Sequence, residues 1–345
     1  MVSKIIGNGS FQLLKSLSVV MLVTVISGCA VDQQKLKWTT TRVQEAEEHF
    51  ETAEGLKTEE AYPYDFKKAR QELIQAKQYL EKEKLEKALP AAESSLTASK
   101  NILKRYYLDE IAKKADALKK NIEKKVREDE DSPLKEYIPE LNEILDFAED
   151  LEKGQQITSL EKVLESIDIC LNIQDSAESY RSEKLESDVS FEIGQYRLSD
   201  RGMQILEEAF LRRIISDKDR YKRQSPDGMI TIKIKVVGYT DQIGFNEGKP
   251  LFRKLREGVE YDIPHDQPER RQFLNRRLSE FRAKAISGYV YQAILETESR
   301  NSRVKVEQEA IGRGEDIPQG VIPSGLVNDP QRRICKIYSH YTVHK

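Results

Sequence analysis

Apolar residues recur every three or four positions from about residue 40 to residue 185. This spacing places them along one side of an α-helix, where they can pack against a neighbouring helix. Breaks in the pattern fall near residues 55, 63, 81–84, 128–133 and 154. Short connections between helices favour antiparallel neighbours. We therefore expect residues 40–185 to form a helical-hairpin or coiled-coil-like region, in which residues 85–126 would span ~60 Å if they formed one helix.

The pattern changes near Ser187, where alternation of apolar and polar residues becomes prominent. Such alternation predicts half-buried strands, which we expect at residues 189–193, 229–237, 303–310 and 334–343. Two helical stretches, 198–215 and 278–295, lie between these strands, and Ser199 is a suitable cap for the first. The order β-α-β-α-β-β predicts an α+β sandwich with helices on one face of a small sheet. The fold class is thus multidomain, with an all-α region of residues 40–185 followed by an α+β domain of residues 187–345.

The first 28 residues have the features of a secretory signal peptide. Lys4 and Lys15 precede an apolar run at residues 17–26, which is too short for a spanning helix of about 20 residues. Gly28 then precedes Cys29, and this stretch resembles a bacterial lipobox. The resemblance implies cleavage before Cys29, acylation of that cysteine and a lipidated linker over residues 29–39. An ordinary signal peptide that contains a cysteine, or a short N-terminal anchor, is the alternative.

Lipidation of Cys29 would determine where the rest of the chain lies. Two or more acyl chains hold a protein stably on a bilayer, whereas a single chain binds only marginally. Ala30, rather than an aspartate, follows the cysteine. In lipoproteins of diderm bacteria, which the N-terminus resembles, this implies transfer to the outer membrane. We expect a lipid-anchored protein, with palmitate among its acyl chains, that faces the periplasm.

Composition bears on the partners and on the redox state. The 56 basic and 59 acidic side chains give a net charge of −3, so there is no basic excess to indicate a nucleic-acid partner. Cys170 and Cys335 are the cysteines that remain after Cys29, and both lie in apolar contexts. We expect two buried free thiols, with a structural disulfide in the periplasm as the alternative. No cofactor is expected, because the sequence has no glycine loop of the kind that binds phosphates.

Four motifs within residues 187–345 resemble the OmpA/MotB-like peptidoglycan-associated domain. They are the strand end VVGYTDQIG, the helical run NRRLSEFRAKA, the loop IGRGEDIP and the run DPQRRICKI. The motifs follow one another in the order of that family, which is a more specific signal than any one of them. The resemblance implies a non-catalytic domain that binds the diaminopimelate side chain of the peptidoglycan stem peptide.

The same resemblance implies which residues would bind this ligand. Asp241 would accept the ligand ammonium, and Arg282 would bind its carboxylate, for which the planar guanidinium is suited. Taken alone, an aspartate after a strand often caps a turn and a helical arginine often faces solvent, but the ordered motifs favour binding. Thr240 and Gly244 would shape the turn that holds Asp241. The other expected site residues are Asn275, Leu278, Ser279, Arg332 and Arg333.

Three features depart from the family pattern. Residues 245–273 separate the turn after Asp241 from the helix, and their glycines, prolines and charges predict a surface loop near the site. Loop entropy grows slowly with length, so the fold can tolerate this insertion. The loop would cover the site, add contacts or serve another partner. Gly194 stands where the family has an aspartate, and Gln331 stands where it has an asparagine.

Two functions are consistent with these observations. The first is an outer-membrane lipoprotein that binds peptidoglycan and tethers the membrane to the cell wall. The second is an envelope adaptor, whose helical region binds a protein partner while the C-terminal domain localises it or has lost wall binding. Catalysis is not expected from the four histidines. His340 and His344 lie on a predicted strand, where four residues extend over ~13 Å, which suits metal binding poorly.

Overall fold

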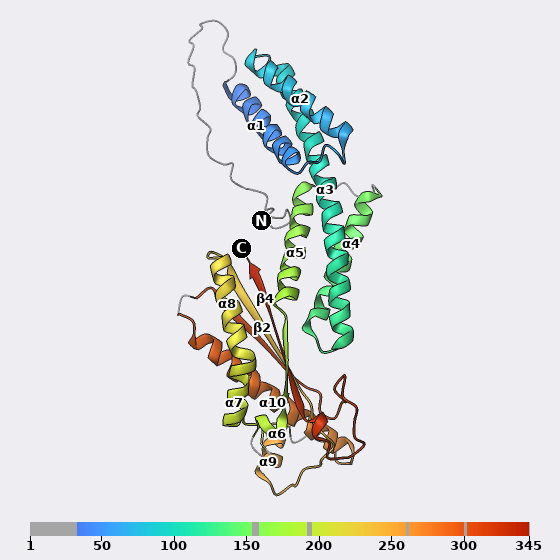
Figure 1. Ribbon diagram of the computed structural model, residues 1–345, viewed down its shortest axis with the longest axis vertical. Helices are drawn as coiled ribbons and strands as arrows, with labels where there is room; N and C mark the ends of the chain where they lie inside the picture. The colour runs from blue at the N-terminus through green and yellow to red at the C-terminus, as the bar shows by residue number, and fades with distance from the viewer. Residues whose placement is uncertain (1–32, 154–158, 192–194, 260–261, 300–301, 345) are drawn as a thin grey trace. The chain divides into compact units, whose positions relative to one another are not determined.

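The computed structural model describes residues 33–345 except 154–158, 192–194, 260–261, 300–301 and 345 (Figure 1). The predicted signal peptide, Cys29 and Gly194 lie outside the described residues. The chain divides into two compact units. Unit 1 holds the described residues up to Lys113 together with Asp146–Ile169, and unit 2 holds Lys114–Leu145 and Cys170–Lys345.

Unit 1 is helical, as the apolar stripe predicts. It contains α1 (Gln33–Gly55), α2 (Pro63–Glu81), the first part of α3 (Leu85–Glu128), the end of α4 (Tyr137–Glu152) and the start of α5 (Leu160–Ser179). Alanines allow the backbones of neighbouring helices to approach closely, because their side chains end at Cβ. In addition, the Ser95 hydroxyl of α3 donates to the Ala69 carbonyl of α2 at 2.8 Å. The fully buried alanines of α1, α2 and α3 include Ala46, Ala53, Ala69, Ala76, Ala88 and Ala92.

Unit 2 is built on a four-stranded sheet of order β1-β4-β2-β3. Its strands are β1 (Arg181–Glu186), β2 (Met229–Gly238), β3 (Val304–Gly312) and β4 (Ile334–His344). β2 and β3 are parallel, whereas β4 is antiparallel to both β1 and β2. The last three strands lie where the alternation predicts them. A helical region, followed by an α+β region with a mixed sheet, agrees with the expected fold class.

The first strand is not where the sequence pattern predicts it. Ser187–Ser190 forms the helical turn α6, and the strand is formed instead by Arg181–Glu186. The run RSEKLE contains a single apolar residue, Leu185, which is buried opposite Cys335 of β4. An edge strand with charged residues on its open side has almost no alternation to detect. The prediction of a strand is therefore wrong for residues 189–190, which belong to α6, whereas Phe191 forms an isolated bridge with Leu198 and residues 192–193 lie outside the described residues.

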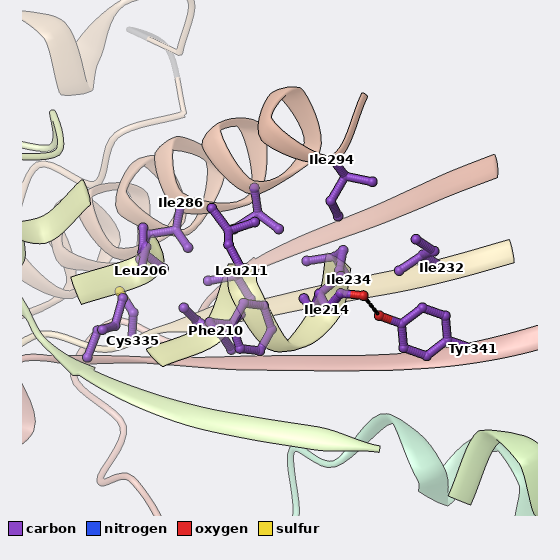
Figure 2. Packing of buried hydrophobic residues seen from close by; sticks show 14 of the residues in the cluster. Leu206, Phe210, Leu211, Ile214, Ile232, Ile234, Ile286, Ile294, Cys335 and Tyr341 are labelled. Carbon is purple, nitrogen blue, oxygen red and sulfur yellow. Dashed lines mark hydrogen bonds between the residues drawn. The ribbon is translucent and has the colours of Figure 1, made fainter. Parts of the chain in front are cut away.

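One face of the sheet carries the apolar core of unit 2. This face is covered by α7 (Asp200–Leu206), the π-helical turn η3 (Glu207–Leu211), α8 (Arg212–Gln224) and α10 (Glu269–Glu296). Ser199 caps α7 as predicted, since its Oγ accepts a hydrogen bond from the Gly202 amide at 2.9 Å. Figure 2 shows the core, where the Tyr341 hydroxyl of β4 donates to the Ile214 carbonyl at 2.7 Å. Removal of this apolar surface from water stabilises the unit.

The opposite face of the sheet is also covered, which the sequence pattern did not predict. Side chains alternate along a strand, and because Cys335, Ile337 and Tyr341 of β4 lie in the apolar core, Lys336, Tyr338 and His340 point to the opposite face. They meet the connection between α3 and α4, which includes the short 3-10 helix η2 (Pro133–Glu136). The Tyr137 ring lies edge-on to His340 with centroids 5.7 Å apart, and Leu134 is fully buried.

The insertion at residues 245–273 contains regular structure. The helix α9 (Pro250–Arg256) forms within it, and α10 begins at Glu269, before the insertion ends. Phe252 and Leu255 of α9 are buried against Leu274 and Leu278 of α10. The prediction of a plain surface loop is therefore wrong for this part of the insertion.

Two further expectations can be compared with the structure. Cys170 and Cys335 are buried free thiols, as expected, and burial raises the pKa of the Cys170 thiol to about 11. Within the ranges that the structure describes, no helix combines the length and the apolar character that a membrane span requires.

Candidate ligand-binding site

The candidate site lies where the parallel strands β2 and β3 end against α10. A Cβ on Gly238, the last residue of β2, would lie 2.3 Å from the Ser279 carbonyl oxygen of α10. A Cβ on Gly312, the last residue of β3, would lie 2.3 Å from the Arg276 carbonyl oxygen. Side chains at these positions would push the helix away. The glycines of VVGYTDQIG and IGRGEDIP therefore allow α10 to rest directly on both strand ends.

Ser279 and Gly314 hold the loop that follows β3. Gly314 has a φ of +59°, in the left-handed region that favours glycine. Its amide donates to Ser279 Oγ at 2.9 Å, and its carbonyl accepts from the Thr240 amide at 2.7 Å. The Ser279 hydroxyl donates in turn to the Arg276 carbonyl at 2.8 Å. Ser279 is fully buried, and its hydroxyl connects the helix to this loop.

Asp241 is 4% exposed and is held by two donors. Its Oδ2 accepts from Arg333 Nη1 at 2.7 Å, and its Oδ1 accepts from the Ile243 amide at 3.2 Å. Arg333 also forms a short ion pair with Asp188 of α6. Burial acts to lower the pKa of Arg333, but the two carboxylates outweigh it and raise this pKa above its ordinary value. Asp188 is a residue of this cluster that the sequence analysis did not identify.

Arg282 is 8% exposed and has an unusual set of neighbours. Its guanidinium carbon lies 5.1 Å from the Phe191 ring centroid, and its Nε donates to the Gln195 carbonyl at 3.3 Å. Among the described residues, none of the carboxylates lies within 4.0 Å of its nitrogens. Burial lowers the pKa of Arg282, against the more distant charges of Asp188 and Asp241.

Glu315 organises a second cluster beside the first. Its carboxylate accepts two hydrogen bonds from Arg271, at 2.8 and 3.0 Å, and one from Asn275 Nδ2 at 2.8 Å. Asn275 also donates to the Ile243 carbonyl at 3.2 Å, next to the turn of Asp241. Arg332 makes a short hydrogen bond to the Glu315 carbonyl oxygen. Asn275 and Arg332 therefore brace the loops. Glu315, which lies in the IGRGEDIP motif, was not predicted as a site residue from the sequence.

Three of the remaining expected residues have distinct surroundings. Leu278 is 7% exposed and packs in the apolar cluster with α9. Thr240 Oγ1 is buried and has no hydrogen-bond partner within the described part of the chain. Gly244 has open space where a Cβ would lie and no positive φ, so the structure gives no reason for a glycine there. The expectation that Gly244 shapes the turn is wrong.

The cluster offers opposite charges at one edge of the sheet. Asp241 supplies a buried carboxylate, and Arg282 supplies a buried guanidinium. Such an arrangement can bind a small zwitterion by charge-assisted hydrogen bonds. Across the described ranges, no group of histidines, cysteines and acids could hold a metal ion.

Comparisons with known proteins add little to this picture. The chain matches no family model and no curated protein. A solved putative MotB like protein from Desulfovibrio vulgaris is 18% identical and has a TM-score of 0.23, and the match covers 47% of this chain and 76% of that one. The periplasmic domain of Helicobacter pylori MotB is 15% identical with a TM-score of 0.24, over 47% of this chain and 75% of that one. At such TM-scores, neither similarity carries an argument.

Proposed function

We propose that the protein is a non-catalytic lipoprotein of the outer membrane that binds the diaminopimelate side chain of peptidoglycan through unit 2. It would thereby tether the outer membrane to the cell wall. The observation that carries this proposal is the pair of buried opposite charges, Asp241 and Arg282, at the strand edge where the four sequence motifs meet. The charge of Asp241 acts to raise the pKa of Arg282, against the stronger effect of burial.

The chemistry of this ligand matches the pair. The diaminopimelate side chain ends in an ammonium and a carboxylate on one carbon. A buried guanidinium without a carboxylate partner is energetically costly, so Arg282 would gain from binding the ligand carboxylate. The Asp241 carboxylate would accept hydrogen bonds from the ligand ammonium. The unpaired hydroxyl of Thr240 is a third polar group beside Asp241.

Arg333 adds a condition to this binding mode. It occupies Oδ2 of Asp241 in the structure, so a ligand ammonium would have to share the carboxylate or displace the guanidinium. Asp188 also pairs with Arg333, and it would keep a carboxylate next to the guanidinium when the ligand enters. We therefore include Asp188 in the proposed site.

The membrane anchor is proposed from the sequence. The apolar run at residues 17–26 and the pair Gly28-Cys29 support acylation of Cys29. Helix α1 begins at Gln33, shortly after this cysteine. Replacing Cys29 with serine should move the protein from the membrane fraction to the soluble fraction of the envelope.

Co-sedimentation with purified peptidoglycan sacculi tests the binding. The full chain in detergent is used, because a fragment that begins at Ser187 would lack β1, the hydrogen-bonded neighbour of β4. Wild type should sediment with sacculi, whereas folded Asp241→Asn and Arg282→Gln should stay in solution. Asp227→Asn is the matched control, because Asp227 lies just before β2 begins, at the other end of that strand, and its side chain is 98% exposed.

One observation favours the adaptor as a second candidate. Asp241, the acid that the ligand ammonium would need, is already paired with Arg333 within the fold. If folded wild type does not sediment with sacculi, while an unrelated protein known to bind peptidoglycan does, the tethering proposal is wrong. The adaptor would then be the better account, with a protein partner of the helical region to be sought by crosslinking in intact cells.

A further inference from the structure

Three acids, Asp129, Glu130 and Asp131, lie in the turn between α3 and α4, outside the residues that carry the family motifs. We call residues 129–132 the acidic turn. Asp131 is 1% exposed, which is unusual for an acid unless it is paired. Its Oδ1 accepts from Arg313 Nη2 at 3.2 Å, and its Oδ2 accepts a short hydrogen bond from the Tyr239 hydroxyl. Lys336 Nζ lies 3.7 Å from the same carboxylate.

The two main partners of Asp131 adjoin the candidate site. Tyr239 lies between Gly238 and Thr240, two positions before Asp241. Arg313 lies between Gly312 and Gly314 in the loop after β3. The backbones of these two segments are also hydrogen-bonded to each other, because the Arg313 amide donates to the Gly238 carbonyl at 2.9 Å and the Thr240 amide donates to the Gly314 carbonyl at 2.7 Å. Asp131 therefore connects the side chains of Tyr239 and Arg313, which belong to the two segments that border the candidate site. We call these two segments the site edge.

The charges support this geometry. Burial and the hydrogen bond to the Asp131 carboxylate both raise the pKa of Tyr239, so the hydroxyl keeps its proton and donates. Burial acts to lower the pKa of Arg313, but the Asp131 carboxylate raises it overall. Both hydrogen bonds are charge-assisted, which makes them stronger than those between neutral groups.

A second contact connects the same turn to the loop beyond the site. Gln319 Nε2 donates to the Arg127 carbonyl at 2.6 Å at the end of α3. The Gln319 side-chain oxygen accepts from the Glu130 amide. The loop that begins at Gly312 is thus held to the acidic turn at Arg313 and again at Gln319.

Asp129 provides a comparison within the same turn. Its carboxylate accepts from Lys336 Nζ at 2.9 Å and from the Tyr338 hydroxyl at 2.7 Å, both on β4, and from the Asp131 amide at 3.3 Å. It fastens the turn to the sheet, but neither of these β4 residues belongs to the two segments of the site edge. Asp129 therefore reaches the site segments only through Asp131 and β4, whereas Asp131 bonds Tyr239 and Arg313 directly.

We propose that Asp131 is a positioning residue for the ligand site, which makes ligand binding depend on the turn between α3 and α4. It does so by holding Tyr239 and Arg313, so that Asp241 and the 312–315 loop keep the geometry that binds. This inference rests on the proposed function for the identity of the ligand, but the positioning itself can be measured without one.

The first measurement needs no ligand. Amide hydrogen exchange of the full chain in detergent is compared for wild type, Asp131→Asn and Asp129→Asn. We expect Asp131→Asn to speed exchange at the Thr240 and Gly314 amides by about tenfold, on the order of one lost charge-assisted hydrogen bond, with less than about twofold for Asp129→Asn. Equal acceleration in both variants, or none in Asp131→Asn, would overturn the proposal.

The second measurement uses meso-diaminopimelate as the probe, titrated by calorimetry. Asp131→Asn should weaken binding by about tenfold, and Asp129→Asn by less than about twofold, although both lower the melting temperature. Tyr239→Phe combined with Asp131→Asn should cost less than the sum of the single changes, because they remove one shared contact. Equal weakening by Asp131→Asn and Asp129→Asn would contradict the inference. If wild type binds neither probe nor sacculi, the proposed function fails, and the exchange measurement still decides the positioning role.

Discussion

Arg333 Nη1 lies 2.7 Å from Asp241 Oδ2, so the acid that the motifs assign to the ligand is paired within the fold. The pair is largely buried, with side chains 16% and 6% exposed. Removing one partner of such a pair leaves a buried charge without compensation, which is more costly than the pair itself is favourable. The candidate site is therefore also a structural element of unit 2.

Arg333→Gln should lower the free energy of unfolding by about 3 kcal/mol, because Asp241 and Asp188 lose their shared cation. Chemical denaturation measures this change. Arg213→Gln is the matched control, since its ion pair with Glu183 has a nitrogen–oxygen distance of 3.3 Å and an arginine side chain 64% exposed, and exposed pairs contribute at most about 1 kcal/mol. Similar small losses in both variants would show that the Asp241–Arg333 pair does not support the fold.

His340 should make stability depend on pH. It is 2% exposed, and neither ring nitrogen has a hydrogen-bond partner among the described residues. Burial, with Lys233 and Lys235 acting in the same direction and Glu307 opposing them, lowers its pKa from 6.5 to about 4. Between these values only the unfolded chain binds the proton, so the free energy of unfolding should fall as pH falls from about 6.5 to about 4, by up to about 3 kcal/mol.

Denaturation curves at several pH values between 7.5 and 4.5, roughly the range over which an unperturbed histidine titrates, measure this dependence. His340→Phe preserves a ring of similar size and cannot be protonated, so the fall between neutral and acidic pH should become shallower. His265→Gln changes an exposed histidine and should leave the curve as in wild type. An unchanged pH dependence in His340→Phe would assign it to other groups.

Gly238→Ala should destabilise unit 2 by about 1–3 kcal/mol, because the added Cβ would lie 2.3 Å from the Ser279 carbonyl oxygen and overpacking has costs of this order. It should also weaken sacculus binding, since α10 carries Arg282. Gly244→Ala is the control, with no atom within 4 Å of its added Cβ and an expected change within about 0.5 kcal/mol. Thermal unfolding compares the two. Equal stability would mean that α10 does not rest on the strand end as described.

Trp38 should report the proposed anchor. It is the single tryptophan of the chain, is 46% exposed, and follows Cys29 by a short segment. If Cys29 is acylated, the start of α1 is held near the bilayer, where tryptophan favours the interface. Brominated lipids in reconstituted vesicles should quench Trp38 fluorescence, and Cys29→Ser should lose the quenching. Strong quenching in Cys29→Ser would show that contact with the membrane does not need the acyl chains.

The contacts between the acidic turn and β4 show why the sequence pattern did not predict that both faces of the sheet are covered. Lys336 and Tyr338 of β4 are polar positions in an alternating strand, and such positions are expected to face solvent. In the structure they bind Asp129, which is 207 and 209 positions away. Nothing in the local pattern distinguishes a lysine that faces water from one that faces a buried acid.

The sequence by itself determined the helices and the three apolar strands, because periodicity is a property of neighbouring residues. Its motifs also singled out Asp241 and Arg282, through their resemblance to a known domain. Only the tertiary structure decided that Arg181–Glu186 is a strand, that α9 packs on α10, and that Arg333 joins Asp188 to Asp241. The two ion pairs of Arg333 join residues that are 92 and 145 positions apart in the sequence. The other outcomes depend on burial between segments, which no single segment creates. Local spacing determines which surface an element offers, whereas long-range packing determines which groups become buried and charged neighbours.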